Sequence, residues 1–353
     1  MRQWAEMRHI TTAFKSSKIA TLLALSLVVA YAATQFGEYP SQMAYAKLPT
    51  GQMPLAPSGA ADLRKTELAG VPTPLLRPDN LPAIEQPYQV TVVSLKERLD
   101  NLAFDLAQIR QGKEVPRHFV ENLPTDILDI QNVQQRKELF LSISLPLILK
   151  VNEDIARDRA KLSSFISAKA AGEPVSAKQT RWIAQLAKRY NGSTNDLNDL
   201  LARVDMIPAS LALAQSIEES GWGTSRFARN GNALFGQRVW NSGEGLVPHE
   251  RADGQQYEVK AFDKLLQSVE NYALNLNRHP AYSNFRTERQ RERRIYGMAK
   301  GFNLSRALLA YSERGEDYVA ALQNLIVTNN LDQFDDIQLA PERFAQIFNS
   351  SNN

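Results

Sequence analysis

The chain has 353 residues, a length that corresponds to about two domains. Its apolar fraction of 43% and its charged fraction of 22% are typical of folded proteins and exclude disorder along the whole chain. The net charge of +3 comes from the first 33 residues, because basic and acidic residues are equal in number in the rest. A neutral body has no overall positive potential, so nucleic-acid binding is disfavoured. The absence of cysteine excludes disulfides and thiolate metal sites, and four scattered histidines form no metal-binding pattern.

The N-terminus has the pattern of a targeting segment. Basic residues up to Lys18 precede fifteen mostly apolar residues, 19–33. A membrane-spanning helix needs about 20 such residues, so the run fits the core of a signal peptide better. Ala30 and Ala32 supply the small residues of a cleavage site. The alternatives are an uncleaved anchor and a buried helix. A leader or an anchor places the rest of the protein outside the cytoplasm and limits membrane contact to this segment.

Between residues 40 and 200 the sequence predicts a linker followed by helices. Residues 40–87 contain nine of the 17 prolines, which indicates a semi-extended linker. One amphipathic helix is then predicted from apolar residues that recur every three or four positions, Leu95, Leu99, Leu102, Leu106 and Ile109. Further helices are predicted over 133–166, kinked at Pro146, and over 178–190, ended by Asn191. Such stripes indicate packing, or contact with an envelope protein partner, and no chemistry.

Glycine becomes frequent after residue 205, which indicates loops shaped around a site. A short helix is predicted over 209–220, started by a proline and apolar on nearly every side, as a buried helix is. It ends in Glu218 and Glu219, and the following Gly221 can adopt the left-handed conformation that terminates a helix. Two carboxylates at the end of a buried helix point to chemistry rather than to packing.

A carboxyl group at the C-terminal end of a helix is hard to ionise. It meets the negative end of the helix dipole, and partial burial adds a desolvation cost, so both effects raise its pKa. An acid that stays protonated near neutral pH can donate a proton to a glycosidic oxygen. On a helix Glu219 lies over Gln215 and Ser216, nearer the apolar ridge, whereas Glu218 points further from it. We therefore expect Glu219 to be the acid and Glu218 to be a surface carboxylate.

Four motifs follow one another across about 110 residues. Residues 214–223 are Ala-Gln-Ser-Ile-Glu-Glu-Ser-Gly-Trp-Gly, and residues 232–236 are Asn-Ala-Leu-Phe-Gly. Residues 278–282 are Arg-His-Pro-Ala-Tyr, and Tyr311 is followed by Tyr318. In this order the motifs resemble glycoside hydrolase family 73, which comprises bacterial peptidoglycan N-acetylglucosaminidases with a lysozyme-like fold. With its Pro-rich linker and helical lead-in, the chain looks most like the Bax-type branch of bacterial envelope proteins.

The resemblance implies a mainly α fold: a lysozyme-like glucosaminidase domain with a small β-hairpin lobe, preceded by a helical domain. The implied segments are a signal peptide or N-terminal anchor at 1–33, a Pro-rich linker at 34–88, a helical accessory domain at 89–200, a glucosaminidase catalytic domain at 201–335 and a C-terminal tail at 336–353. The implied enzyme is an endo-β-N-acetylglucosaminidase of the cell envelope, most simply of the periplasm. It cuts the β-1,4 bond after N-acetylglucosamine in peptidoglycan glycan strands, and this acid-catalysed hydrolysis needs no cofactor and no metal.

The resemblance makes Glu219 the general acid but leaves the second catalytic group open. Two strands are predicted between residues 246 and 262 and form the hairpin lobe. Within it, Glu250 occupies the place of the second carboxylate that is proposed for the family. The residues around it depart from the family pattern, so Glu244 and Glu258 are alternatives, and a surface ion pair is the other interpretation of Glu250.

Three chemical routes stay open. Two carboxyl groups about 5 Å apart act with retention through a covalent intermediate, and two about 6.5–9.5 Å apart act with inversion through a water molecule. In the third route the 2-acetamido oxygen of the sugar attacks, so that no protein nucleophile is needed. Tyr311 or Tyr318 then orients the acetamido group, unless these rings belong to the core.

Several residues are candidates for substrate contact rather than for reaction. Trp222, Phe235 and Trp240 can stack on sugar rings, with packing as the alternative, and packing is favoured for Phe235. Tyr318 joins them as a hydrogen-bonding group. The five arginines within 286–294 predict a solvated helix face, and contact with anionic peptide stems or lipid headgroups is the alternative.

Two other functions remain compatible with the motifs. A lytic transglycosylase acts on the same glycan and needs only one carboxyl group, but the pairing of Gly-Trp-Gly with Leu-Phe-Gly favours the hydrolase. A non-catalytic envelope scaffold keeps the fold while its sugar site is vestigial, and the intact Glu219 argues against it.

Overall fold

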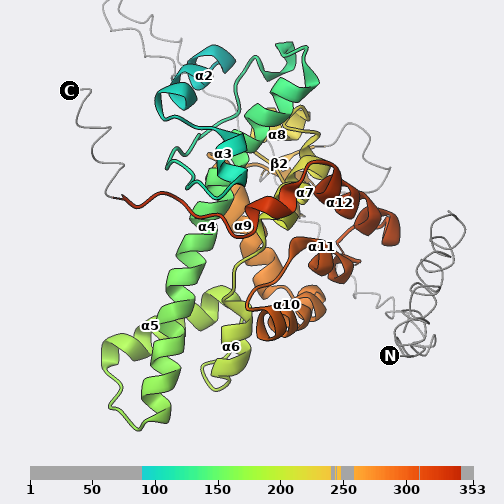
Figure 1. Cartoon of the computed structure of the whole chain (residues 1–353). Coiled ribbons are helices and arrows are strands. Elements are labelled where there is room, and N and C mark those ends of the chain that lie inside the picture. The colour runs from blue at the N-terminus through green and yellow to red at the C-terminus, as the bar shows by residue number, and fades with distance from the viewer. Residues whose placement is uncertain (1–89, 240–242, 244, 248–257, 310, 343–353) are drawn as a thin grey trace, which may run out of the picture. The chain divides into compact units, whose positions relative to one another are not determined.

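The structure is a computed structural model, and it describes residues 90–239, 243, 245–247, 258–309 and 311–342 (Figure 1). The predictions for the leader, the linker, Trp240, Glu244 and Glu250 lie outside the described residues. The helices are α2 Val92–Asn101, α3 Leu106–Arg110, α4 Val133–Ala170, α5 Ala177–Tyr190, α6 Leu197–Arg203, α7 Ala209–Ser220, α8 Arg226–Gly231, α9 Leu265–Arg278, α10 Ser283–Tyr296, α11 Gly301–Leu304 and α12 Glu316–Thr328. Short 3-10 helices lie at Ile127–Asp129, Pro280–Tyr282, Ser305–Leu308 and Leu331–Phe334.

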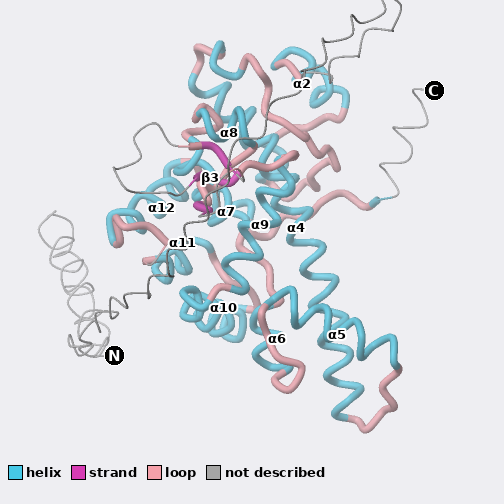
Figure 2. Tube along the Cα trace, turned by 180° about the vertical axis from the view of Figure 1, so that it is seen from behind, coloured by secondary structure: helices cyan, strands magenta, loops and turns pink. Residues whose placement is uncertain are grey.

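The strands are short and form one small antiparallel sheet, visible in magenta among the helices in Figure 2. They are β1 Arg238–Val239, β2 Gly245–Leu246 and β3 Glu258–Lys260. The central strand β3 pairs with both neighbours, with Val259 opposite Arg238 on one side and opposite Leu246 on the other. The predicted mainly α fold with a small β element is confirmed. Within the described ranges, no helix is both long enough and apolar enough to span a bilayer.

Two helices form as their end signals predict. In α5 the side chains of Ser176 and Gln179 make a reciprocal capping box, and Asn191 ends the helix in the left-handed conformation at φ 52°. Helix α7 begins after Pro208 and ends at Gly221, whose φ is 58°. The limits of the helix that carries Glu219 are therefore encoded locally.

The predicted helix through Leu95 and Ile109 is wrong, because the structure divides it into α2 and α3. Ala103 adopts a positive φ of 48° between the two helices. The side chain of Asp105 then accepts hydrogen bonds from the backbone N–H groups of Ala107 and Gln108, which starts a new helix. The apolar spacing continues across the break, so periodicity alone could not reveal it. The next helix, α4, is longer than predicted and continues through Pro146.

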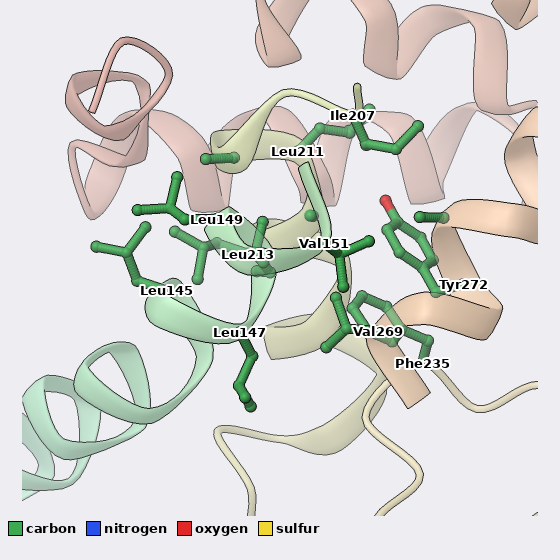
Figure 3. Packing of buried hydrophobic residues seen from close by; sticks show 14 of the residues in the cluster. Leu145, Leu147, Leu149, Val151, Ile207, Leu211, Leu213, Phe235, Val269 and Tyr272 are labelled. Carbon is green, nitrogen blue, oxygen red and sulfur yellow. The ribbon is translucent and has the colours of Figure 1, made fainter. Parts of the chain in front are cut away.

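Helix α4 is the centre of the hydrophobic core. Its residues from Leu139 to Leu149 are buried on every side of the helix, because α7 and α9 pack against it. Figure 3 shows side chains of α4, α7 and α9 in one cluster with Phe235. Helix α7 is covered on its other sides by α11 and α12. The segment upstream of residue 200 thus contributes directly to burying the helix that carries Glu219.

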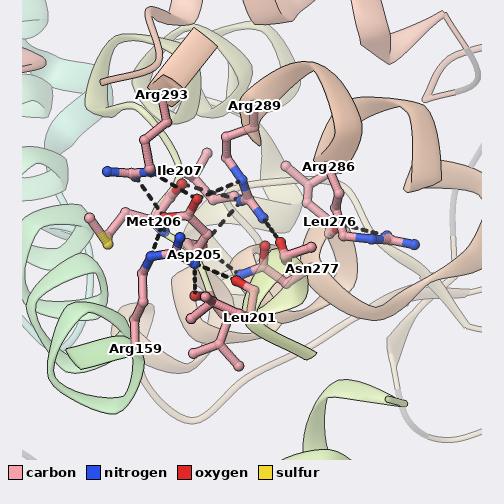
Figure 4. A network of polar contacts seen from close by, with 12 residues as sticks. Arg159, Leu201, Asp205, Met206, Ile207, Leu276, Asn277, Arg286, Arg289 and Arg293 are labelled. Atoms are coloured by element: carbon pink, nitrogen blue, oxygen red, sulfur yellow. Dashed lines mark hydrogen bonds and ion pairs between the residues drawn. The ribbon is translucent and has the colours of Figure 1, made fainter. Parts of the chain in front are cut away.

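A buried charge cluster fixes the chain just before α7. Asp205 is fully buried, and its carboxylate forms ion pairs with three guanidinium groups (Figure 4). The N···O distances are 2.6 Å to Arg293 and 3.6 Å to both Arg159 and Arg289. Arg289 is also fully buried and donates to the backbone carbonyls of Ala202, Asp205 and Met206. Burial lowers the pKa of Arg289 to about 10. The cluster joins α4, α10 and the loop that leads into α7.

The arginines of α10 therefore do not form the solvated face that their density predicts. Arg286 is 5% exposed and donates to the carbonyls of Leu276 and His279, and Arg289 is buried as described above. Only the rest of the series, Arg291, Arg293 and Arg294, retains contact with solvent. For Arg289 the reason is Asp205, which lies far away in the sequence and supplies the buried counter-charge, whereas Arg286 is held by the two carbonyls.

The substitution Asp205→Asn tests the role of this cluster. It leaves three guanidinium groups without their shared counter-charge, so we expect the free energy of unfolding to fall by about 3–5 kcal/mol. Urea unfolding followed by circular dichroism measures the loss. The matched control is Asp199→Asn, whose carboxylate is 41% exposed and pairs with Arg203 at 2.6 Å, and for which we expect a loss of at most about 1 kcal/mol. Equal losses in the two variants would contradict the assignment.

Candidate active site

Glu219 lies in the last turn of α7 and lines a cavity of about 570 Å³. The rest of the lining comes from the loop of Tyr311 to Arg314, from Phe235 and from residues of β1 and α9. The neighbouring Glu218 points elsewhere and pairs with Arg314 at 2.5 Å. The helix thus separates the two adjacent carboxylates as its geometry predicts, with Glu219 facing the cavity.

A chain of buried hydrogen bonds ends on Glu219. The hydroxyl of Tyr272 donates to Gln215 Oε1 at 2.6 Å, and Gln215 Nε2 donates to the hydroxyl of Tyr318 at 3.0 Å. The hydroxyl of Tyr318 in turn donates to Glu219 Oε1 at 3.1 Å. Since Gln215 occupies an acceptor site of Tyr318, the proton of that hydroxyl is directed to Glu219. Gln215 and both tyrosines are at most 1% exposed, so the chain holds one oxygen of the acid in place.

Burial raises the pKa of Glu219 to about 7. The hydrogen bond from Tyr318 acts in the opposite direction and lowers this pKa, because it stabilises the ionised carboxylate. Repulsion from Glu218 raises it further, and Arg314 and Arg238 lower it. Desolvation outweighs the other effects, so Glu219 retains a proton near neutral pH.

The Asn-Ala-Leu-Phe-Gly motif brings a glycine against the acid. Gly236 has a positive φ of 55°, and a Cβ at this position would lie only 2.9 Å from Glu219 Oε2. Any side chain here would therefore displace the carboxyl group. The preceding turn is held by Asn232, whose amide donates to the carbonyls of Phe262 and Asp263 and to Asn122. The motif thus encodes close approach to Glu219.

The aromatic candidates within the described residues occupy different places. Phe235 is buried and stacks on Tyr272 at 3.9 Å, and it forms part of the cavity floor. Tyr311 lines the cavity, stacks on Tyr318 at 5.6 Å and donates to the carbonyl of Phe235 at 3.3 Å. Burial raises the pKa of Tyr311 well above its usual range, so its hydroxyl stays protonated.

Trp222 lies on a different face of the α7 terminus. Its ring meets Phe140 of α4 edge-on at 5.9 Å, and Lys137 Nζ lies 4.9 Å from the ring centre. Among the described residues that line the Glu219 cavity, Trp222 does not occur. Its backbone adopts a left-handed φ of 60° between two glycines, which turns the chain sharply after α7. The structure brings Glu219, Phe235, Tyr311 and Tyr318 together and places Trp222 towards the core.

One alternative for the second carboxylate is already engaged elsewhere. Glu258 is 7% exposed, although strand alternation predicts it on the outer face. Its carboxylate accepts hydrogen bonds from the backbone N–H groups of Gly243 and Gly245, at 2.9–3.1 Å, which holds β2 against β3. Glu313, which the sequence analysis missed, does line the cavity and pairs with Arg238 at 3.1 Å. Its position two residues after Tyr311 in the fourth motif is the signal that could have revealed it.

The described ranges contain no cluster of metal-binding side chains. Within them, no group of three or more histidine, aspartate or glutamate side chains is placed to hold a metal ion. The cavity instead combines the carboxyl group of Glu219, phenolic hydroxyls and the charged groups Lys260, Arg238, Glu313 and Arg314. Such a set can donate a proton and hydrogen-bond a polar, uncharged ligand.

Comparison with known proteins identifies the family. The glucosaminidase family, described as mannosyl-glycoprotein endo-beta-N-acetylglucosaminidase, matches residues 194–331. Protein bax of Escherichia coli (strain K12) is 35% identical over 219 residues, which are 60% of this chain and 76% of that protein. The catalytic domain of the autolysin Auto from Listeria monocytogenes is 21% identical, with 49% of this chain and 96% of that domain covered and a TM-score of 0.29. The family predicted from the four motifs is thereby confirmed. The chain belongs to the family of the E. coli protein bax and carries a glucosaminidase domain that contains the Glu219 cavity.

Proposed function

We propose that the protein is a peptidoglycan hydrolase that cuts the β-1,4 bond after N-acetylglucosamine, with Glu219 as the general acid. The observation that carries this proposal is the carboxyl group of Glu219, which is desolvated, faces a cavity and has a pKa of about 7. An acid of this kind is half protonated at neutral pH and can protonate a leaving sugar oxygen. The glucosaminidase match supports the class of bond, and a peptidoglycan substrate fits a protein of the cell envelope.

In the proposed reaction, each group of the cavity has one task. Glu219 gives its proton to the glycosidic oxygen as the bond from that oxygen to the sugar carbon breaks. Tyr318 holds Glu219 Oε1, and Gly236 leaves room beside Oε2. The electron-poor sugar carbon is then attacked by the Glu250 carboxylate, by a water molecule that Glu250 deprotonates, or by the 2-acetamido oxygen oriented by Tyr311. In the first and third routes a water molecule then opens the intermediate, which completes the hydrolysis. Trp240 is proposed to contact a sugar ring, whereas Phe235 packs on Tyr272 and supports the cavity from within the core. No step requires a metal or a cofactor.

The N-terminal segment gives the protein its proposed location. A signal peptide or anchor at residues 1–33 and a Pro-rich linker at 34–88 would carry the glucosaminidase domain into the periplasm. There it would meet glycan strands as its substrate, and the helical region offers a surface for an envelope protein partner.

The substitution Glu219→Gln tests the general acid. Gln keeps the size of the side chain but has no proton to give, so we expect the rate of peptidoglycan cleavage to fall by about 10²–10⁴-fold. The purified full chain is incubated with cell-wall peptidoglycan, and released fragments are quantified by mass spectrometry. Glu218→Gln is the matched control, because the Glu218 carboxylate pairs with Arg314 and does not itself line the cavity, and we expect its rate to stay within about threefold of wild type.

The chemical ends of the released peptidoglycan fragments distinguish a hydrolase, a lytic transglycosylase and a non-catalytic scaffold. N-acetylglucosamine at the new reducing ends is the expected product. A 1,6-anhydromuramyl end would instead identify a lytic transglycosylase. Intact peptidoglycan after incubation with the wild-type protein would favour the scaffold.

The pH dependence of cleavage tests the pKa and its cause. Only protonated Glu219 donates, so we expect the rate to be high in acid solution and to fall as the pH rises through about 7. The hydrogen bond from Tyr318 lowers this pKa, so Tyr318→Phe removes that stabilisation and moves the midpoint to higher pH. Rates measured between pH 5 and 9 locate both midpoints. A shift of the midpoint to lower pH in Tyr318→Phe would contradict the proposed hydrogen bond.

The raised pKa also predicts a pH-dependent stability. Glu219 binds its proton more tightly in the folded protein than in the unfolded chain, whose usual value is 4.5. The free energy of unfolding is therefore highest, as far as Glu219 is concerned, below about pH 4.5. It falls by roughly 3 kcal/mol as the pH rises from there through about 7. Gln has no proton to lose, so the free energy of unfolding of Glu219→Gln should not fall in this way. The difference between the variant and wild type should therefore increase in favour of the variant between pH 4.5 and 8. Urea unfolding at several pH values measures the difference, and a constant difference would exclude a raised pKa.

A further inference from the structure

A second cavity, of about 590 Å³, opens beside the one that contains Glu219. Its outer wall is formed by the helical region before the glucosaminidase match, with Asp154 and Asp158 from α4 and Arg189 and Tyr190 from α5. The inner wall is formed by α9, including Glu270, and by the end of β3. None of the described motif residues lines it.

The two cavities adjoin along α9. Lys260 at the end of β3 and Asn271 of α9 line both of them. Beyond these shared residues, Asn275 faces the Glu219 cavity, while Glu270 and Leu274 face the second one. Because α9 packs against both α4 and α5, it forms a common floor that runs from the acid towards the upstream helices. A polymer seated over Glu219 can therefore extend into the second cavity.

The lining of the second cavity carries charges of both signs. Asp158 pairs with Arg189 at 2.7 Å, and Asp154 pairs with Lys150 at 2.6 Å. Glu270 has no ion-pair partner within 4 Å in the described part of the chain. Burial and the charge of Asp154 raise the pKa of Glu270, and the charge of Lys150 offsets this only in part. A ligand with an amine near Glu270 would relieve this repulsion, and its carboxylate could join Arg189 or Lys260.

We propose that the second cavity binds the peptide stem attached to the glycan strand, so that the upstream helices select substrates that carry stems. This inference rests on the proposed function, because it assigns a further part of the same peptidoglycan substrate. Peptide stems present free carboxylates and free amines on a short chain, which matches a lining with charges of both signs. A glycan strand without stems keeps one lactyl carboxylate on each N-acetylmuramic acid but carries no amine, so it offers no partner for Glu270. The buried arginines of α10 are not available for this task, since they are bound to Asp205 and to backbone carbonyls.

The experiment compares two substrates and four proteins, which are wild type, a test variant, a control variant and Arg189→Lys. The substrates are peptidoglycan glycan strands with their stems and the same strands after an amidase has removed them. The test protein is the double variant Arg189→Ala/Glu270→Gln of the full chain. The control is Arg291→Ala/Glu288→Gln, an exposed pair on α10 at 3.6 Å that lies outside both cavities. Release of reducing ends gives kcat and KM, and urea unfolding checks that each variant folds.

We expect wild type and control to prefer stem-bearing strands by about tenfold in kcat/KM, mainly through KM. In the test variant this preference should fall to about one, and Arg189→Lys, which retains the charge, should keep most of it. Equal cleavage of the two substrates by wild type would overturn the inference while leaving the proposed hydrolase intact. A full preference in the double variant would also overturn it. Cleavage of neither substrate by wild type would instead overturn the proposed function itself.

Discussion

The desolvation of one carboxyl group at the end of α7 is the constraint that relates the core to the site. Water around Glu219 would return its pKa to the ordinary range and remove the reason for its protonation near neutral pH. The helix is shielded on one side by α4 and on the others by α11 and α12. Its apolar residues Leu211, Leu213 and Ile217 are at most 2% exposed. The core therefore does more than stabilise the fold, because it creates the low-dielectric surroundings that the acid needs.

The pKa of Glu219 is a balance between burial and one hydrogen bond. Burial alone would raise it further, and the hydroxyl of Tyr318 brings it back towards neutrality. That hydroxyl is oriented by Gln215, which is oriented in turn by Tyr272. A general acid works best when its pKa lies near the working pH, so such a balance suits catalysis better than burial alone. Gln215 and Tyr318 belong to the recognised motifs, and this network gives a physical reason for their presence.

How far the sequence predicts this site depends on how local each signal is. The limits of α7, the left-handed Gly221 and the different directions of the Glu218 and Glu219 side chains follow from neighbouring residues, and the structure agrees with these predictions. The bond between Tyr272 and Gln215 joins residues 57 positions apart, and that between Arg293 and Asp205 joins residues 88 positions apart. No spacing rule relates such pairs, so the arginines of α10 were assigned to solvent. The burial of Glu258 is hidden for a related reason, because strand alternation does not register two backbone N–H groups that require a buried acceptor.

The helical region before residue 200 contributes to the site in two ways that its sequence does not predict. Its leucine stripes indicate packing, and α4 does pack against α7. Residues more than 60 positions before Glu219 therefore help to exclude water from its carboxyl group. A segment restricted to the glucosaminidase match at 194–331 would leave Leu211 and Leu213 without this cover. The polar face of the same helix supplies Asp154 and Asp158 to the second cavity. The same helix thus shields Glu219 with its apolar side and contributes charged side chains to the second cavity.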